Sequence, residues 1–361
     1  MQSIEEARST AEIRSGMVFK KSQGHYDVEA DGDTIDCELS TTLRKQLIYP
    51  ISAGCKHPPT DPVGCSRCRP GGTVHRRVQS VADIREQDPI AVGDLVRFIR
   101  ADEGRGIITE VLPRKNQLVR RAAGKKPIKQ VIVANADLVI AVAAAKQPAP
   151  AWGLVDRYLA AAEEAELPAC IVITKMDLVE ADAFTAEIAT YTDIGYQVIR
   201  TSSATGSGID ELRATMRGRI SVFAGKSGAG KTTLLNTLQP ELGLRVAEVG
   251  RQTHKGKHTT THLQMFALSV GGAIVDTPGM REFGLWDVTT ERERHEHGGG
   301  EIATLFPDLR PYVGRCRFGL DCSHTHEPGC AITRAVAEGA ISPRRHLSYL
   351  RIVGRADGSE E

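Results

Sequence analysis

The stretch Gly225-Lys226-Ser227-Gly228-Ala229-Gly230-Lys231-Thr232 decides the fold of the central part of this chain. An apolar run at 220–223, which predicts a strand, precedes it, and residues 233–238, which predict a helix, follow it. A strand, a G-x-x-x-x-G-K-T turn and a helix in this order are typical of a phosphate-binding loop. The glycines let backbone N–H groups curl around a phosphate, and the helix N-terminus adds its positive dipole end. We therefore expect a bound nucleotide here; a glycine-rich turn with a chance lysine is the plain alternative.

Several residues of this region are candidates for phosphate and magnesium contacts. Lys231 is expected to reach the β- and γ-phosphates, and Thr232 to place its hydroxyl on Mg²⁺, with Thr233 next to it in the first helical turn. Downstream, an apolar strand ends in the D-x-x-G sequence of residues 276–279. Asp276 can hold the Mg²⁺ shell, and the N–H group of Gly279 can sense a γ-phosphate.

Upstream of the loop, another strand ends in Thr174-Lys175-Met176-Asp177, which looks like the guanine-specifying N-K-x-D box of GTPases. Asp177 is expected to accept hydrogen bonds from the N1 and N2 donors of guanine. Ser202, Ser203 and Ala204 look like the companion loop, in which Ser203 and Ala204 are the candidate contacts of the base. Alone, T-K-x-D also fits an ordinary transition from strand to loop. In ordinary GTPases the base motifs follow the phosphate loop, whereas here they precede it, so the order predicts a circularly permuted GTPase.

Length and composition set broad limits. The chain has 361 residues, which suggests two to three domains, and its 41% hydrophobic content is enough for sizeable cores. A formal net charge of +1 excludes binding of polyanions by bulk charge, so any nucleic-acid surface must be a local patch. The eight cysteines include two clusters with metal-like spacing, which favours a reducing compartment over disulfides. We expect a cytoplasmic monomer with no membrane partner, since no signal peptide or spanning segment is visible.

Residues 1–130 contain short stretches with strand character, separated by turn signals. In one of them Ile35, Cys37 and Leu39 alternate with acids, as in a half-buried strand. We expect an OB-like β-barrel that binds RNA, a preference that rests mainly on the family resemblance described below; any small β-sandwich is the alternative. An insert at about 47–80 carries a candidate second zinc site. The alternative interpretation is a flexible loop with free thiols. The candidate ligands of the site are Cys55, His57, Cys65 and Cys68.

Residues 131–290 alternate strands and helices, which predicts a mostly parallel sheet with helices on both faces. One buried strand is expected over 131–142. The polar segment 249–261 lies between the two phosphate motifs, and Thr260 is our candidate for completing the Mg²⁺ shell there. Met280 follows the D-x-x-G motif where many GTPases carry a water-orienting glutamine. Methionine cannot orient water, so His258 is the candidate catalytic residue.

Residues 291–361 are expected to form a zinc-binding domain that ends in a helix over 331–353. Cys316-x₅-Cys322-x-His324-x₅-Cys330 supplies three thiols and an imidazole, a strong structural-zinc signal. The terminal helix is expected to show a basic face that includes Arg344 and Arg345. A second basic stretch, residues 113–130, contains no acid, and we expect it to contact RNA, although such runs are more often solvated linkers.

Together these motifs resemble the RsgA/YjeQ family of circularly permuted GTPases that depend on the small ribosomal subunit. The segments that carry this resemblance most specifically are residues 225–232, 257–261, 276–283 and 326–331. The resemblance implies a β-barrel, a permuted GTPase domain and a zinc domain. It also implies hydrolysis of GTP to GDP late in maturation of the small subunit, contact with ribosomal RNA, and stimulation by the subunit. The chain departs from the family pattern at Thr174, which replaces asparagine, at Lys257, which replaces arginine, in a longer first zinc-ligand spacing, and in the insert.

Two other classes of function remain open at this stage. One is a P-loop ATPase or metabolite kinase with a fortuitous T-K-x-D, for which ATP and GTP should bind comparably. The other is a non-catalytic RNA-binding module with a degenerate nucleotide site, which the intact Lys231, Thr232 and Asp276 disfavour.

Overall fold

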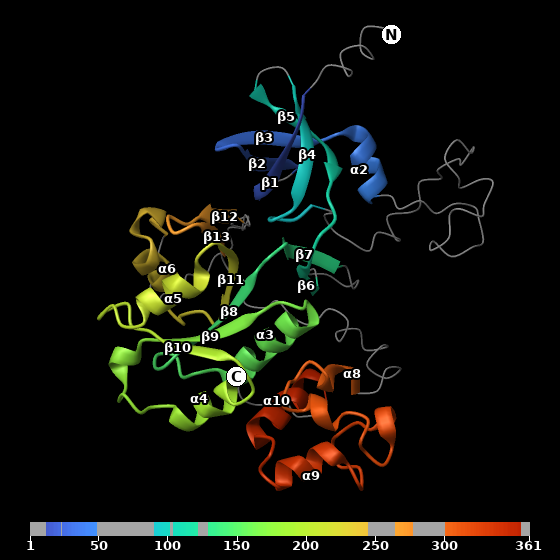
Figure 1. The fold of residues 1–361 in the computed structure, drawn as a ribbon, viewed down its shortest axis with the longest axis vertical. Helices are drawn as coiled ribbons and strands as arrows, with labels where there is room; N and C mark the ends of the chain where they lie inside the picture. Colours follow the sequence, from blue (N-terminus) through green and yellow to red (C-terminus); the bar gives the residue numbers. More distant parts are fainter. Residues whose placement is uncertain are drawn as a thin grey trace, which may run out of the picture. The chain divides into compact units, whose positions relative to one another are not determined.

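The structure, a computed structural model, describes residues 12–22, 24–48, 90–101, 104–121, 129–244, 264–276 and 300–354. The chain divides into two compact units (Figure 1). The first lies within residues 1–113 and 122–131, and the second within residues 114–121 and 132–361. The insert at 47–80, the segment 249–261 and the predicted boundary near residue 290 fall largely or wholly outside the described residues, so the domain limits stay predictions.

The first unit is the predicted five-stranded barrel. Its strands are β1 (Ile13–Ser22), β2 (His25–Ala30), β3 (Asp33–Leu39), β4 (Leu95–Arg100) and β5 (Gly106–Val111), and α2 (Thr41–Ile48) follows β3. They pair in the order β1-β2-β3-β5-β4, and β1 also pairs with β4, which closes the barrel. The alternation expected in β3 is confirmed, because Ile35, Cys37 and Leu39 all lie in the barrel core. At Gly106 a Cβ would lie 2.3 Å from the Cys37 sulfur, so any side chain there would displace part of the barrel core.

The second unit is built on a six-stranded sheet with the order β10-β9-β8-β11-β13-β12. The strands are β8 (Leu138–Ala144), β9 (Ala169–Thr174), β10 (Gln197–Arg200), β11 (Arg219–Gly225), β12 (Gln264–Ala267) and β13 (Gly272–Asp276). All adjacent pairs are parallel except β12 with β13. The central strand β8 is buried at every position, as expected of a parallel strand covered on both faces.

Helices cover both faces of this sheet (Figure 1). They are α3 (Trp152–Glu164), α4 (Thr185–Thr192), α5 (Ile209–Met216) and α6 (Lys231–Leu238). Leu138, Ile140 and Val142 of β8 share a core with α5 and α6. Because successive side chains of a strand point to opposite faces, the remaining residues of β8 face the other side, and α3 packs on β8.

The single strand expected over 131–142 was wrong. It is two strands, β7 (Lys129–Ala134), which pairs with β6 (Gln117–Arg121), and β8. Asn135 interrupts them with a φ of 54°, a left-handed conformation that asparagine tolerates better than most residues. The carboxylate of Asp137 then accepts a hydrogen bond from the backbone N–H of Ile220 at 3.0 Å. Asn135 and Asp137 thus end β7 and direct the chain into β8 of the central sheet.

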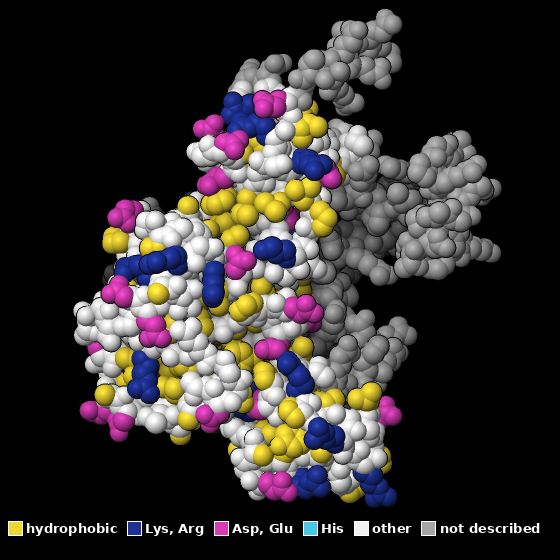
Figure 2. Space-filling view, in the orientation of Figure 1, with side chains coloured by type: hydrophobic (Ala, Val, Ile, Leu, Met, Phe, Trp, Pro, Cys, Tyr) yellow, Lys and Arg dark blue, Asp and Glu magenta, His cyan; other side chains and the backbone are white. Residues whose placement is uncertain are grey.

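Residues 300–354, here called the C-terminal lobe, contain α8 (Gly300–Ala303), α9 (Ala331–Ala337) and α10 (Pro343–Ile352). The continuous helix expected over 331–353 was wrong: Gly339 has a φ of 79°, and Pro343 opens a new helix because its missing N–H costs nothing in the first turn. In the face drawn in Figure 2, Lys and Arg side chains are interspersed with Asp and Glu. No helix within the described ranges has the length and apolar character needed to cross a membrane.

Candidate functional site

The phosphate loop connects β11 to α6, as predicted. Gly228 and Gly230 have φ values of 80° and 83°, a conformation that glycine adopts without strain. At Gly225 a Cβ would lie 2.4 Å from the Val142 carbonyl oxygen, so β11 lies too close to β8 for a side chain where the loop starts. Lys231 Nζ donates to the carbonyl of Lys226 at 3.0 Å, which holds this ammonium group within the loop. Thr232 and Thr233 follow in the first turn of α6.

The T-K-x-D segment at the end of β9 is bonded directly to the phosphate loop. Thr174 is buried, and its hydroxyl lies 2.6 Å from the carbonyl oxygen of Ala229 and 3.3 Å from that of Ala143. Lys175 Nζ donates to the carbonyl of Gly228 at 2.8 Å. Threonine at position 174 therefore supports the phosphate loop. The two motifs meet although 53 or 55 residues separate the bonded partners.

The carboxylate of Asp177 is oriented by Ser202, the first residue of the predicted base-contacting loop. Ser202 is buried, and its hydroxyl donates to Asp177 Oδ1 at 2.6 Å. The backbone N–H of Thr205 bonds the same hydroxyl oxygen at 3.2 Å, which fixes its direction. Ser203 and Ala204 come next in this turn. The sequence showed a serine-rich loop, but it could not tell which of two adjacent serines points to the aspartate.

The strands bring these motifs to one edge of the sheet. β9, β8, β11 and β13 are consecutive and parallel, so T-K-x-D, the phosphate loop and Asp276 follow the carboxyl ends of neighbouring strands. Ligands bind at this edge in open α/β sheets. The predicted residues His258, Thr260 and Gly279 lie outside the described residues, as does the side chain of Asp276. The same holds for Cys55, His57, Cys65 and Cys68.

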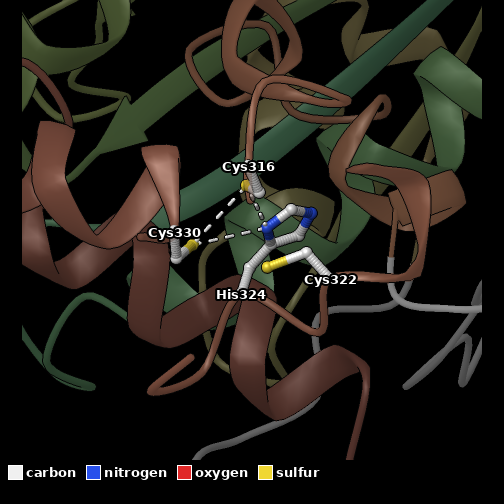
Figure 3. Close-up of side chains that lie close together, drawn as sticks. All are labelled: Cys316, Cys322, His324 and Cys330. Carbon is white, nitrogen blue, oxygen red and sulfur yellow. Dashed lines mark hydrogen bonds between the residues drawn. The ribbon is translucent and has the colours of Figure 1, made fainter. Parts of the chain in front are cut away.

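A candidate metal centre lies in the C-terminal lobe (Figure 3). Cys316, Cys322, His324 and Cys330 are all buried, and their candidate ligand atoms lie within 4.8 Å of one another. The sulfur of Cys316 lies 3.8 Å from that of Cys330 and 3.5 Å from His324 Nδ1. The Cys330 sulfur lies 3.6 Å from the same nitrogen.

These distances fit a tetrahedral ion. With Zn–S bonds of about 2.3 Å and a Zn–N bond of about 2.0–2.1 Å, a regular tetrahedron separates two sulfurs by about 3.8 Å and a sulfur from a nitrogen by about 3.6 Å. Without a bound metal ion, burial raises the pKa of the Cys322 thiol to about 12. A divalent cation reverses this preference, because a coordinating thiol is deprotonated. The backbone N–H of Ala331 already donates to the Cys316 sulfur at 3.2 Å.

The loop that carries His324 is held by a neighbouring carboxylate. Glu327 accepts hydrogen bonds from the backbone N–H groups of Ser323 and Thr325, both at 2.9 Å, and of His326 at 3.2 Å. Burial raises the pKa of Glu327, but hydrogen bonds from its own backbone N–H and from Ser323 and Thr325 outweigh burial and lower the pKa below its usual value. His324 has a φ of 58°, and the Glu327 bonds stabilise this uncommon backbone conformation. The ligand set is thus preorganised.

Comparison with known proteins places the chain among GTPases. A family model described as RsgA GTPase matches residues 111–286. The small ribosomal subunit biogenesis GTPase RsgA of Bacteroides fragilis is 37% identical over 342 residues, covering 94% of this chain and 96% of the relative. The protein of the same name from Gemmatimonas aurantiaca is 42% identical over 265 residues, covering 73% of this chain and 83% of the relative.

Two solved structures match nearly the whole chain. The crystal structure of YjeQ from Thermotoga maritima has a TM-score of 0.66 at 28% identity, covering 97% of this chain and all of the other. YloQ, a circularly permuted GTPase, has a TM-score of 0.61 at 25% identity, covering 95% of this chain and 94% of the other. The permuted motif order predicted from the sequence therefore agrees with the description of YloQ as a circularly permuted GTPase.

Proposed function

The chain belongs to the RsgA GTPase family and hydrolyses GTP, and we propose that it does so late in maturation of the small ribosomal subunit. In this proposal it binds ribosomal RNA, and the subunit stimulates hydrolysis. One observation carries the proposal: the base motif is hydrogen-bonded to the phosphate loop. The Thr174 hydroxyl donates to the carbonyl of Ala229, and Lys175 Nζ donates to that of Gly228. This geometry supports guanine selection next to a phosphate cradle, as the relatives named small ribosomal subunit biogenesis GTPases would need.

We assign the nucleotide contacts as follows. The backbone of residues 225–230 surrounds the phosphates, Lys231 neutralises their charge, and Asp177 accepts the guanine donors, with Ser203 and Ala204 beside the base. Bound Mg²⁺ offsets phosphate charge, and Thr232, Thr260 and Asp276 are its proposed ligands. His258 is proposed to orient the attacking water, because Met280 cannot. A site without a water-orienting glutamine should hydrolyse GTP slowly until a partner stimulates it.

RNA contact is proposed for local patches and not for the barrel as a whole. On the described barrel surface Arg14 pairs with Asp31 at 2.6 Å, and Arg97 pairs with Glu110 at 2.9 Å. The stretch 113–130 holds seven Lys and Arg residues and no acid, so it is our candidate for the RNA-contacting edge. We propose zinc at the Cys₃His cluster, a monomer that exchanges GTP and GDP, and a cytoplasmic location.

The test is GTP hydrolysis by the purified chain, with and without small ribosomal subunits, and with ATP in place of GTP. Strong stimulation that is selective for GTP is the expected result. Equal use of ATP would contradict guanine selection and favour a P-loop ATPase or kinase. Hydrolysis of GTP that small subunits leave unchanged would contradict the proposed partner while leaving the GTPase intact. A Lys231→Ala variant, in which nucleotide binding should be lost, shows that the activity belongs to this site.

A further inference from the structure

Asp156 ties the C-terminal lobe to helix α3. Its side chain is fully buried, and its carboxylate accepts hydrogen bonds from four side chains. Oδ1 accepts from the Tyr191 hydroxyl and from Arg345 Nη1, both at 2.8 Å, and Oδ2 accepts from Ser348 Oγ at 2.6 Å and Arg344 Nη1 at 3.0 Å. Three of the four donors belong to α10. Because a shift of either helix would leave a buried charge unpaired, this cluster fixes α10 against α3.

The two arginines of this cluster differ in their surroundings. Arg345 is 1% exposed, and its guanidinium also donates to Asp308 Oδ1 at 2.6 Å within the C-terminal lobe. Burial disfavours its charge, but Asp156 and Asp308 outweigh this effect and raise the pKa of Arg345. Arg344 lies farther out and covers two aromatic rings, with its guanidinium carbon 5.6 Å from the centre of Trp152 and 5.1 Å from that of Tyr191. Arg345 anchors α10, whereas Arg344 reaches the start of α3.

Trp152 is the first residue of α3, and the chain reaches it from β8 through residues 145–151. This connection is bonded to the base motif. The carbonyl of Gln147 accepts a hydrogen bond from Lys175 Nζ, and the backbone N–H of Ala145 donates to the carbonyl of Thr174 at 2.8 Å. The same Lys175 ammonium group donates to Gly228 in the phosphate loop. The position of Lys175 thus depends on where residues 145–151 lie.

We propose that Arg344 is a positioning residue for the nucleotide site. By holding Trp152 it sets the connection 145–151, and through the Gln147 carbonyl it sets the Lys175 ammonium group over the phosphate loop. The inference rests on the proposed assignment of Lys175 to the GTP site. It gives the C-terminal lobe a part in nucleotide affinity that is separate from its metal and from RNA.

A double-mutant cycle tests this route, with a fluorescent GDP analogue as the probe. Arg344→Met keeps the apolar stem and removes the guanidinium, and it should raise the Kd for GDP about fivefold or more, a typical coupling between sites. In the Lys175→Ala background the same substitution should add almost nothing, because its effect passes through Lys175. Arg344→Lys keeps the charge toward Asp156 but loses the planar group over the rings, so an intermediate Kd is expected.

The matched control is Arg334→Met on α9, whose side chain is 73% exposed, and this variant should bind GDP like the unmodified chain. Thermal unfolding checks that each variant folds, and Arg344→Lys carries the test if Arg344→Met does not fold. If the double variant raises the Kd for GDP by the product of the two single fold-changes, the proposal is overturned. Arg344 and Lys175 would then act on GDP binding independently. An unchanged Kd in Lys175→Ala would instead overturn the assignment of Lys175 to the site, and the inference with it.

Discussion

A single buried hydroxyl sets the direction of the Asp177 carboxylate, which we propose to bind guanine. Ser202→Ala removes the 2.6 Å bond to Asp177 and leaves a void where the hydroxyl was. Hydrogen bonds to charged groups contribute about 1.5–3 kcal/mol, so the Kd for GTP should rise about tenfold or more. Affinity for GDP should fall in parallel, because both nucleotides carry the same base. Titration with each nucleotide measures the change.

Ser207→Ala is the control for this prediction. Ser207 lies in the same turn and is exposed, and its backbone carbonyl, which the substitution keeps, accepts from the N–H of Ser202 at 3.0 Å. We expect nucleotide affinity close to that of the unmodified chain. Equal losses in both variants would show that the turn as a whole, and not the Ser202 hydroxyl, orients Asp177.

A buried thiol gives the second unit a defined alkaline response. Burial raises the pKa of Cys170 on β9 to about 12, whereas an unfolded thiol titrates near about 8.5. Between these values the unfolded chain releases a proton that the folded chain keeps, so stability is full below about pH 8.5 and falls as pH rises. Cys170→Ala should make the loss shallower by up to about 1.4 kcal/mol per pH unit.

Urea unfolding at several pH values, followed by tryptophan fluorescence, measures this slope. Trp152, the first residue of α3, lies in the second unit and reports on its unfolding. Ile171→Val is the matched control, since it removes a methylene from the neighbouring buried position without removing a titrating group. It should lower stability equally at every pH. A slope that Cys170→Ala leaves unchanged would show that the thiol does not keep its proton in the folded chain.

At the scale of elements, the phosphate loop depends on how closely β11 approaches β8. Gly225→Ala places a Cβ 2.4 Å from the Val142 carbonyl oxygen, and backbone can relieve this contact only by moving a strand. We expect stability to fall by about 1–3 kcal/mol. The Kd for GDP should rise, because β11 carries the phosphate loop. Thermal unfolding and GDP titration measure both effects.

Gly153→Ala is the natural comparison for that substitution. In α3 the new Cβ would lie 3.7 Å from Arg351 Nη1, an ordinary contact, and alanine favours a helix over glycine by about 0.8–1.0 kcal/mol. This variant should be as stable as the unmodified chain or more so, with GDP affinity retained. Nucleotide binding that survives Gly225→Ala intact would mean that the loop tolerates movement of β11.

The elements that the sequence predicted well are those whose chemistry is local. Glycine conformation, a following helix and a buried apolar run define the phosphate loop and β9 without help from distant residues. The break between β7 and β8 was missed because Asn135 and Asp137 act through contacts with residues far along the chain. Arg345 was expected on an exposed basic face, but it is buried against Asp156, 189 residues away. A partner at that distance leaves no trace in local periodicity.

At the scale of the whole molecule, the C-terminal lobe has an apolar core that includes Phe306 and Tyr349, whose rings lie 5.9 Å apart. A metal ion at the Cys₃His cluster would join residues 316–330 to that core. His346 on α10 contacts the carbonyl of His324 at 2.8 Å, so α10 is packed against the metal loop on one side and α3 on the other. Loss of the ion should therefore loosen the loop first.

Metal analysis by mass spectrometry tests this view. The purified chain should hold about one zinc ion, or two if the cysteines of the 47–80 insert also bind, and Cys322→Ser should lower the count by one. Cys65→Ser separates the two cases, because it lowers the count only if the insert binds metal. After chelation, limited proteolysis should cut residues 316–330 before the central sheet, since the ligands are spaced along that loop. Zinc-free protein whose 316–330 loop resists proteolysis as well as the loaded protein would contradict a structural metal, and the preorganisation by Glu327 would then be sufficient to hold the loop alone.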